Sequence, residues 1–450
     1  MGLRLALLAG RSGVMTASTG VNTVSNDIAG AADPAYARRI VQTSSAVSVR
    51  RGSSYLGTGT QVDRISRSTD DLLAKRAIAE RGSEQLSLGL SGALAPLETI
   101  VDPTGSDGLR ARLDQWYDAL GKATVDPTDG GLRGEVLART QSLVDGFQTS
   151  HAALDTVVDD ANSRVPVAIG RINQRLAEIG AINEARVAGR SGEDLMDRRD
   201  AALDELADLT GTTADLHADG TVTVFLGGHA LVDGGNARPL HWNPADDTIH
   251  IGSPTNGIDI STTMGGQVGG WLAAREKATT WLADLNTTAK SFADAVNAVH
   301  STGFGMDGVN GRPLFSYVAG QEASTLSIDA SMVGQPDRLA FASIPTSSGD
   351  GTTLRSLMAL EDTALIGTQK VGDALTSFVG AIGTSIAEAD LDATAAGSRR
   401  GDLDALLANL ESVDLDEAAA KLMEWRSAWQ ASSRVIKVAD ELMGELMRLV

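Results

Sequence analysis

The sequence predicts a mainly helical protein of the α+β class, with β structure inserted between helices. Three observations predict this class. Aromatic residues make up only 4% of the chain and cysteine is absent, so the cores must be built from Ala, Leu, Val and Ile. Both ends of the chain carry long apolar seams with heptad spacing. Between the ends, helical patterns alternate with short runs of β-branched residues.

Length, net charge and the lack of cysteine limit the functions that this chain could have. The 450 residues suggest roughly three domains. The net charge of −20 disfavours binding to nucleic acid or to an anionic membrane surface. The lack of cysteine excludes disulfides, thiolate catalysis and iron–sulfur clusters. No apolar run is long enough to predict membrane insertion, and the first ten residues lack the pattern of a cleaved signal peptide.

The first element is an N-terminal helix that ends at Ala32-Asp33-Pro34, because proline disfavours helix at the residue before it. Its apolar residues are spaced alternately four and three apart over nearly four heptads, as in a coiled coil. The small members permit a close approach of another helix. The seam consists of Leu3, Leu7, Gly10, Val14, Ala17, Val21, Val24 and Ile28.

The last element is a C-terminal helix with a second seam, for which Asp414 and Glu417 form an acidic variant of the capping box. Each seam needs a partner, because a lone helix in water gains almost nothing from its apolar stripe. The two ends could pack on the body of the protein, or they could pair with each other and with neighbouring subunits. The second seam consists of Leu415, Ala418, Leu422, Trp425, Trp429, Ser432, Ile436, Ala439, Met443, Leu446 and Val450.

Between the ends, periodicity and turn residues predict the remaining elements. Pro166 lies inside the longest predicted helix and should kink it. Helical patterns cover 69–100, 108–123, 132–188, 193–209, 266–298 and 354–389, with a charged, leucine-rich segment at 397–412. Strand patterns occur at 40–43, 46–49, 61–65, 221–225, 248–251 and 325–328.

These elements suggest a nested organisation, in which helices from both halves form one body and β structure is inserted between them. The expected domains are a terminal helical domain from 1–33 and 413–450; a helical body from 34–210, 265–302 and 355–412, with a β element near 35–66; an inserted β domain at 211–264; and a glycine-rich segment at 303–354 of uncertain membership.

No catalytic, cofactor or metal site is expected. The six histidines have no compact metal-binding spacing. The GxGxxG at 303–308 follows a helix rather than a strand, which is the wrong context for a dinucleotide site. Four aspartates at helical spacing, interleaved with arginines, are interpreted as a solvated helix face. They are Asp197, Asp200, Asp204 and Asp208.

One N-terminal stretch resembles the signature of bacterial flagellar rod, hook and hook-associated proteins. It runs over 22–29 and 34–39, and the chain departs from the signature at Asp27, Gly30, Asp33, Ala35 and Ala37. The residues that carry the resemblance are Asn22, Ser25, Asn26, Pro34 and Tyr36.

Three further stretches resemble the hook-associated protein 1 (FlgK) family within that group. They are 194–203, 309–315 and 413–436, with Trp429 in place of the usual tyrosine. The first contains a DLMDRRD motif with Asp194, Asp197, Arg199 and Asp200.

The resemblance implies a structural protein without enzymatic activity or cofactor. It implies a secreted, extracellular subunit that forms a ring of helical lattice at the hook–filament junction of the flagellum. Its partners would be further copies of itself, the hook protein, and a second junction protein or flagellin. The resemblance also implies export by the flagellar type III apparatus, a cytosolic chaperone on the C-terminal helix, and terminal helices that pair coaxially along the tube.

Three alternatives stay open at this point. A hook or distal-rod protein would share the first signature but should lack the segment at 194–203. A flagellin-like filament subunit would not be expected to carry the 22–36 motif. A hydrolase would need convergent carboxylates in the β insertion, and no pair there commits to this chemistry.

Overall fold

The computed structural model describes residues 2–33, 36–51, 54–101, 108–190 and 192–448. Its contacts divide the chain into two compact units. The first contains residues 1–82, 172–239 and 397–450, and the second contains residues 83–171 and 240–396. Three of the four boundaries fall inside α2 (Asp71–Leu94), α5 (Gly130–Val187) and α10 (Val371–Glu411), and the fourth lies between Pro239 and Leu240.

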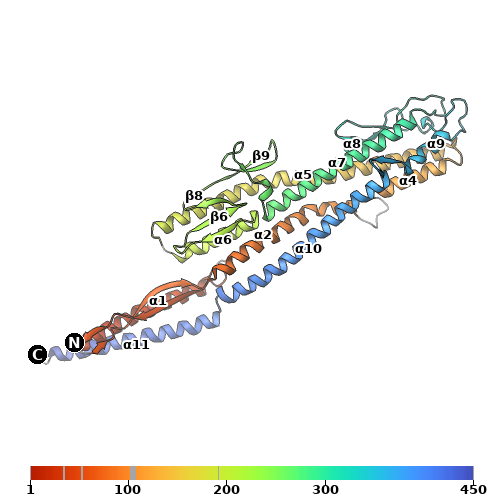
Figure 1. Cartoon of the computed structure of the whole chain (residues 1–450). Coiled ribbons are helices and arrows are strands. Elements are labelled where there is room, and N and C mark those ends of the chain that lie inside the picture. The colour runs from red at the N-terminus through yellow and green to blue at the C-terminus, as the bar shows by residue number, and fades with distance from the viewer. Residues whose placement is uncertain (1, 34–35, 52–53, 102–107, 191, 449–450) are drawn as a thin grey trace. The chain divides into compact units, whose positions relative to one another are not determined.

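The terminal helices of the first unit lie side by side and antiparallel (Figure 1). They are α1 (Gly2–Gly30) and α11 (Leu415–Arg448), so the described part of each seam is helical. The pairing agrees with the fold predicted from the heptad spacing, in which small residues let the two backbones approach.

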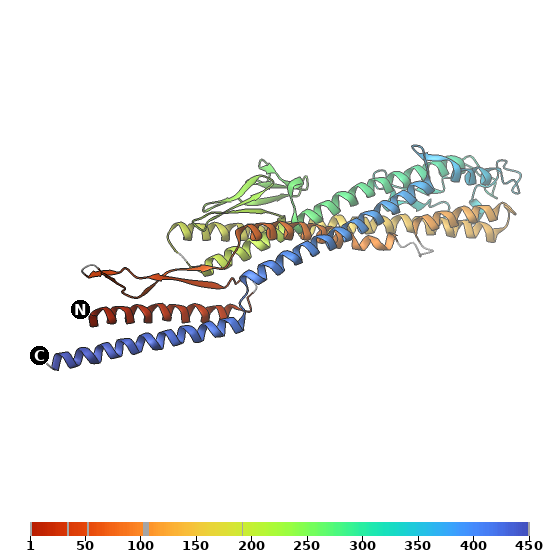
Figure 2. The same cartoon turned by 60° about the horizontal axis from the view of Figure 1, so that its bottom comes forward.

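A long antiparallel hairpin follows α1 and lies along it (Figure 2). Its base is a ladder of two strands that pairs Arg39 with Arg67 at one end and Ser45 with Thr60 at the other, with an irregularity at Gln42/Thr43. The ends of the hairpin were predicted as strands from their β-branched residues, whereas most of 46–49 lies outside the strands. The strands are β1 (Arg39–Ser45), β2 (Val49–Arg51), β3 (Ser54–Leu56) and β4 (Thr60–Arg67).

The first unit also contains α6 (Glu193–Thr210) and an antiparallel sheet in the order β5-β6-β7-β8. The buried Asn183 of α5 holds this sheet, because its side chain donates to the carbonyls of Val222 and Gly234 and accepts from the Val222 amide, at 2.8–2.9 Å. The strands are β5 (Thr213–Leu216), β6 (Val222–Leu226), β7 (His229–Asp233) and β8 (Asn236–Ala237).

The second unit is a helical bundle with a continuous apolar core. Trp116 is fully buried at its centre, stacks edge-on against Phe292, and donates to the Thr140 hydroxyl at 2.9 Å. Its helices, besides parts of α2, α5 and α10, are α3 (Glu98–Val101), α4 (Leu109–Ala123), α7 (Gly266–His300), α8 (Glu322–Thr325) and α9 (Thr352–Met358), with 3₁₀ turns at Ala95–Leu97, Ser261–Thr263, Pro336–Arg338 and Ala359–Asp362.

The second unit also contains short strands, some of which contact α7. One sheet has the order β11-β10-β9, and two further pairs are β12-β13 and β14-β15. The strands are β9 (Leu240–Asn243), β10 (Thr248–Ile251), β11 (Ile258–Asp259), β12 (Phe315–Ser316), β13 (Ser327–Ile328), β14 (Ala364–Ile366) and β15 (Gln369–Lys370).

Three sequence expectations differ from the structure. The β insertion expected over 211–264 consists of two sheets that belong to different units, because the chain leaves the first sheet before Leu240. The helix predicted over 354–389 is wrong: the short α9 ends at Met358, and a tight hairpin with Gly367 at a φ of +59° precedes α10. Helix α10 then continues through 397–411, although Gly397 and Gly401 are poor helix formers.

Residue 166 lies within α5, which continues as helix on both sides of this proline. Within the described part of the chain, no helix is long and apolar enough to cross a membrane.

Candidate assembly site

The close contact between α1 and α11 depends on glycines of the N-terminal seam face. A Cβ placed on Gly10 would lie 2.8 Å from a side-chain carbon of Ile436, and one placed on Gly20 would overlap the indole of Trp425. Gly13 faces Ser432 in the same way. Larger residues at these positions would force the helices apart, so the small residues set their separation.

The structure brings most of the predicted seam residues together along this contact. In α1 the predicted large residues are half-buried or buried, and in α11 the middle of the seam is half-buried. These residues are Leu3, Leu7, Val14, Val21, Val24 and Ile28 of α1, and Leu422, Trp425, Ser432 and Ile436 of α11.

Other members of the C-terminal seam stay exposed within the chain. Leu415 is 56% exposed, Trp429 44% and Leu446 52%, and Met443 is also exposed; Val450 lies outside the described residues. Further apolar side chains are exposed on α11, including Met423 at 66% and Val438 at 54%. Thus α1 covers only part of the apolar surface of α11.

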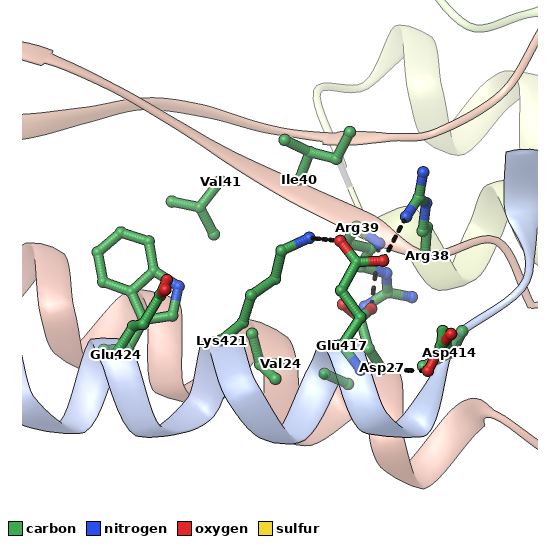
Figure 3. Close-up of a pocket in the computed structure, with 13 residues that line it drawn as sticks. Val24, Asp27, Arg38, Arg39, Ile40, Val41, Asp414, Glu417, Lys421 and Glu424 are labelled. Carbon is green, nitrogen blue, oxygen red and sulfur yellow. Dashed lines mark hydrogen bonds and ion pairs between the residues drawn. The ribbon is translucent and has the colours of Figure 1, made fainter.

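Arg38 joins the end of α10 to the start of α11 (Figure 3). Its amide donates to the carbonyl of Glu411 at 2.8 Å and its Nε to the carbonyl of Leu410 at 3.0 Å, where a cation complements the negative end of the helix. Its Nη1 lies 3.3 Å from the carboxylate of Glu417 in the first turn of α11. The predicted Asp414 cap is present, since its carboxylate accepts from the Glu417 amide at 3.1 Å.

Asp27 ties the end of α1 to the start of the hairpin. It is buried, and its Oδ1 accepts from the Tyr36 hydroxyl at 2.7 Å and from the Arg39 amide at 3.1 Å. Burial, together with this bond to a carboxylate, raises the pKa of the Tyr36 hydroxyl. Tyr36 therefore stays a protonated donor, and its bond to Asp27 joins α1 to the residues that enter β1.

A network of ion pairs, here called the junction network, joins the base of the hairpin to α6. Arg39 and Arg67 stand opposite each other in the ladder, where two like charges repel. Asp197 of α6 lies within 3.1 Å of both guanidiniums, and Asp200 bridges Arg67 and Arg199 at 2.7 Å each. The aspartates thus resolve the repulsion, and the pairing holds the hairpin on α6.

The prediction that these aspartates form a solvated face is wrong for Asp197, which is buried. Burial raises the pKa of its carboxyl although the two arginines lower it. Asp204 and Asp208 pair with Arg81 of α2 at 3.2 Å. Burial raises the pKa of Asp204 to about 6. Helical spacing could not show this, because the partners lie on other elements.

The family-motif residues divide into two groups. Asn22, Ser25, Asn26 and Asp194 are exposed, and Pro34 lies outside the described residues. The other motif residues form the hydrogen bonds and ion pairs just described. They are Tyr36, Asp197, Arg199 and Asp200.

Sequence reasoning missed four residues of the site, namely Asp27, Arg38, Arg39 and Arg67. One signal could have found three of them: residues 38–67 contain six arginines and one aspartate in a chain of net charge −20. The described residues contain no group of three or more His, Asp or Glu arranged to hold a metal ion. The interactions described for the site are apolar contacts, hydrogen bonds and ion pairs.

Comparison with known proteins shows which proteins this chain is similar to. Residues 94–315 match the family model of the flagellar hook-associated protein FlgK helical domain. Flagellar hook-associated protein 1 of Salmonella typhimurium is 28% identical over 333 residues, which cover 68% of this chain and 58% of that protein. The match to that relative thus spans little more than half of its length. The protein of the same name from Bacillus subtilis is 22% identical over 99% of this chain and 97% of its own.

The fold has a solved counterpart. The flagellar hook junction protein FlgK from Burkholderia pseudomallei superposes with a TM-score of 0.63 at 15% identity, over 73% of this chain and 98% of that structure. The family model, the relatives and the shared fold agree with the terminal motifs of the sequence. In its helical domain, in its relatives and in its fold, the chain is similar to flagellar hook-associated protein 1, FlgK.

Proposed function

We propose that this protein is a structural subunit of the bacterial flagellum that joins hook to filament and assembles through its terminal helices. The observation that carries the proposal is the incomplete cover of α11. Trp429 and Leu446 belong to a regular seam and yet stay about half exposed in the single chain. Full burial of one large apolar side chain stabilises by roughly 1.5–3 kcal/mol, so neighbouring subunits would gain from covering them.

The proposal assigns further partners by the same reasoning. In the assembled flagellum, neighbouring copies, the hook protein and a second junction protein or flagellin would cover the exposed seam. Before export through the type III apparatus, a cytosolic chaperone would cover α11. The contacts of Arg38 hold the end of α10 against the start of α11. The outer surface of the α1–α11 pair would therefore be available to these partners.

The test is to delete the gene and restore it with variants. Cells without the protein should carry bare hooks in negative-stain images and shed filament protein into the medium. A chain with Trp429→Gln, Met443→Gln and Leu446→Gln should fail to restore filaments. The matched control replaces exposed valines outside α11, Val125→Gln and Val187→Gln, and should restore them.

Immunolabelling supplies the location. Label confined to the hook tip in the complemented strain supports the junction assignment. Label along the whole filament, or normal filaments in the deletion strain, would refute it.

A further inference from the structure

His300, the last residue of α7, is fully buried and holds two separate points of the loops that follow it. Its Nδ1 lies 2.8 Å from the carbonyl oxygen of Arg312, and its Nε2 accepts from the backbone amide of Ala340 at 2.9 Å. One imidazole therefore fixes residues 312 and 340 to the end of a long helix.

These two partners permit only one protonation state of the imidazole. A carbonyl oxygen can only accept, so Nδ1 carries the proton, and a backbone amide can only donate, so Nε2 keeps its lone pair. The imidazolium form has a proton on both nitrogens and would set two N–H groups against each other at Ala340. Protonation of His300 therefore breaks the bond to Ala340 and leaves a charge in a buried place.

The charges that act on His300 in the described part of the chain add to this cost, because both are cations. They are the guanidiniums of Arg312 and Arg133. Arg133 of α5 is 1% exposed and donates to the carbonyl of Leu339, next to Ala340, at 2.8 Å. Burial lowers the pKa of His300 most; the bond to the Arg312 carbonyl raises it, and the two cations lower it further.

The carboxylates of this region act on the two arginines. Asp307 pairs with Arg312 at 2.6 Å. Burial lowers the pKa of Arg133, and the charge of Asp337 opposes that effect. A proton on His300 would thus be a third positive charge beside two that are already present.

The attachments on either side of the Ala340 bond do not titrate. Asn297, on the preceding turn of α7, accepts from the Leu314 amide at 2.8 Å through its neutral side chain. Ala342 is held by two backbone bonds to Phe304, at 2.8 and 3.3 Å. The effect of protonation should therefore be confined to residues 336–341, here called the latched stretch.

We propose that His300 is an acid-sensitive latch, which holds the latched stretch against α7 while the imidazole is neutral and releases it when the imidazole binds a proton. This inference does not rest on the proposed function. Opening would uncover Leu339 and Phe341, which are buried in the apolar core of the closed state. The ordinary pKa of histidine is 6.5 and that of the folded chain is lower, so the latch contributes fully above pH 6.5 and is lost as the pH falls through the lower value.

Hydrogen–deuterium exchange of the purified chain at pH 7.5 and pH 4.5 tests the latch, with protection corrected for the intrinsic effect of pH on exchange. We expect the latched stretch to lose at least about tenfold in protection at pH 4.5, while Leu314 keeps its own. In His300→Gln the side-chain oxygen can still accept from Ala340 but cannot gain a proton, so protection should be equal at both pH values. The matched control His217→Gln, at an exposed histidine, should behave as the parent.

Equal protection of the latched stretch in the parent at both pH values would refute the latch, and so would a loss at pH 4.5 that persists in His300→Gln. If that variant does not fold, nitrogen-15 spectra of the parent decide. They should show His300 neutral with its proton on Nδ1 at pH 7.5, and charged at pH 4.5. A proton on Nε2 at pH 7.5, or a neutral His300 at pH 4.5 while the latched stretch opens, would overturn the inference.

Discussion

Asp197 shows how one carboxylate can hold two segments that are distant in sequence. It is the shared partner of Arg39 and Arg67, and its side chain is only 12% exposed. Removing one partner of a buried ion pair leaves uncompensated charge, which costs about 3–5 kcal/mol. We therefore expect Asp197→Ala to lower the free energy of unfolding by that amount in urea titrations followed by circular dichroism.

The control for this prediction is Asp215→Ala. Asp215 also pairs with a cation, Lys75, but its side chain is 60% exposed, and such surface pairs contribute at most about 1 kcal/mol. Equal losses in the two variants would show that the junction network does not hold the hairpin on α6.

Asp204 gives the first unit a pH dependence of defined sign. Burial raises its pKa in the folded chain to about 6, above its ordinary value of 3.8. Between these two pH values the folded state binds more protons than the unfolded state, so this group's contribution falls as pH rises from about 4 to 6. Asp204→Asn should therefore raise the Tm relative to the parent more at pH 7.5 than at pH 4.5.

Asp194→Asn is the matched control, because Asp194 lies on the same helix and is exposed. Differential scanning fluorimetry of both variants at the two pH values is sufficient. If Asp204→Asn changed the Tm equally at both pH values, and by no more than Asp194→Asn does, the raised pKa of Asp204 would be contradicted.

At the scale of elements, Ser432 tests the facing surfaces of α1 and α11. It is half-buried against Gly13, so an added carboxylate there would lose water without gaining a cation. We expect Ser432→Asp to leave the second unit folded but to block incorporation into flagella, whereas Ser432→Ala should be nearly neutral. Motility and the melting curve of the purified chain measure the two effects, and normal swimming by Ser432→Asp would exclude this face of α11 from the assembled interface.

The two tryptophans of α11 should separate stability from partner binding. Trp425 packs over Gly20, whereas Trp429, one turn further, is 44% exposed. Trp425→Ala should lower stability by about 1–3 kcal/mol, and Trp429→Ala should change it by less than about 0.5 kcal/mol. The double variant should weaken both chaperone binding and junction assembly. If calorimetry shows an unchanged affinity of the double variant for the chaperone, the chaperone does not bind this face of α11.

At the scale of the whole molecule, the isolated chain should be a monomer with protease-sensitive ends. Two helices with a single seam between them are marginal in water, since they bury little apolar surface. Limited trypsin digestion should cut within residues 1–40 and 415–450 and leave a resistant middle. Resistance of a free monomer at both ends would contradict the view that α1 and α11 await partners.

The sequence by itself determined the terminal helices, the mainly helical class and the resemblance to FlgK. Heptad spacing is a local property, because residues three and four apart fall on one helix face whatever surrounds them. The helices α1 and α11 could therefore be predicted, although Leu415, Trp429 and Leu446 of the second seam are exposed in the single chain, and the motif at 194–203 lies on α6.

Only the tertiary structure decided which charges meet. Arg39 and Asp197 are 158 positions apart, and nothing in the spacing of either predicts their ion pair at 3.1 Å. The same holds for Arg38 at the end of α10 and for Asp27 beneath Tyr36. An ion pair depends on distance and burial, which are set when separate elements pack, whereas an apolar seam is written along one helix.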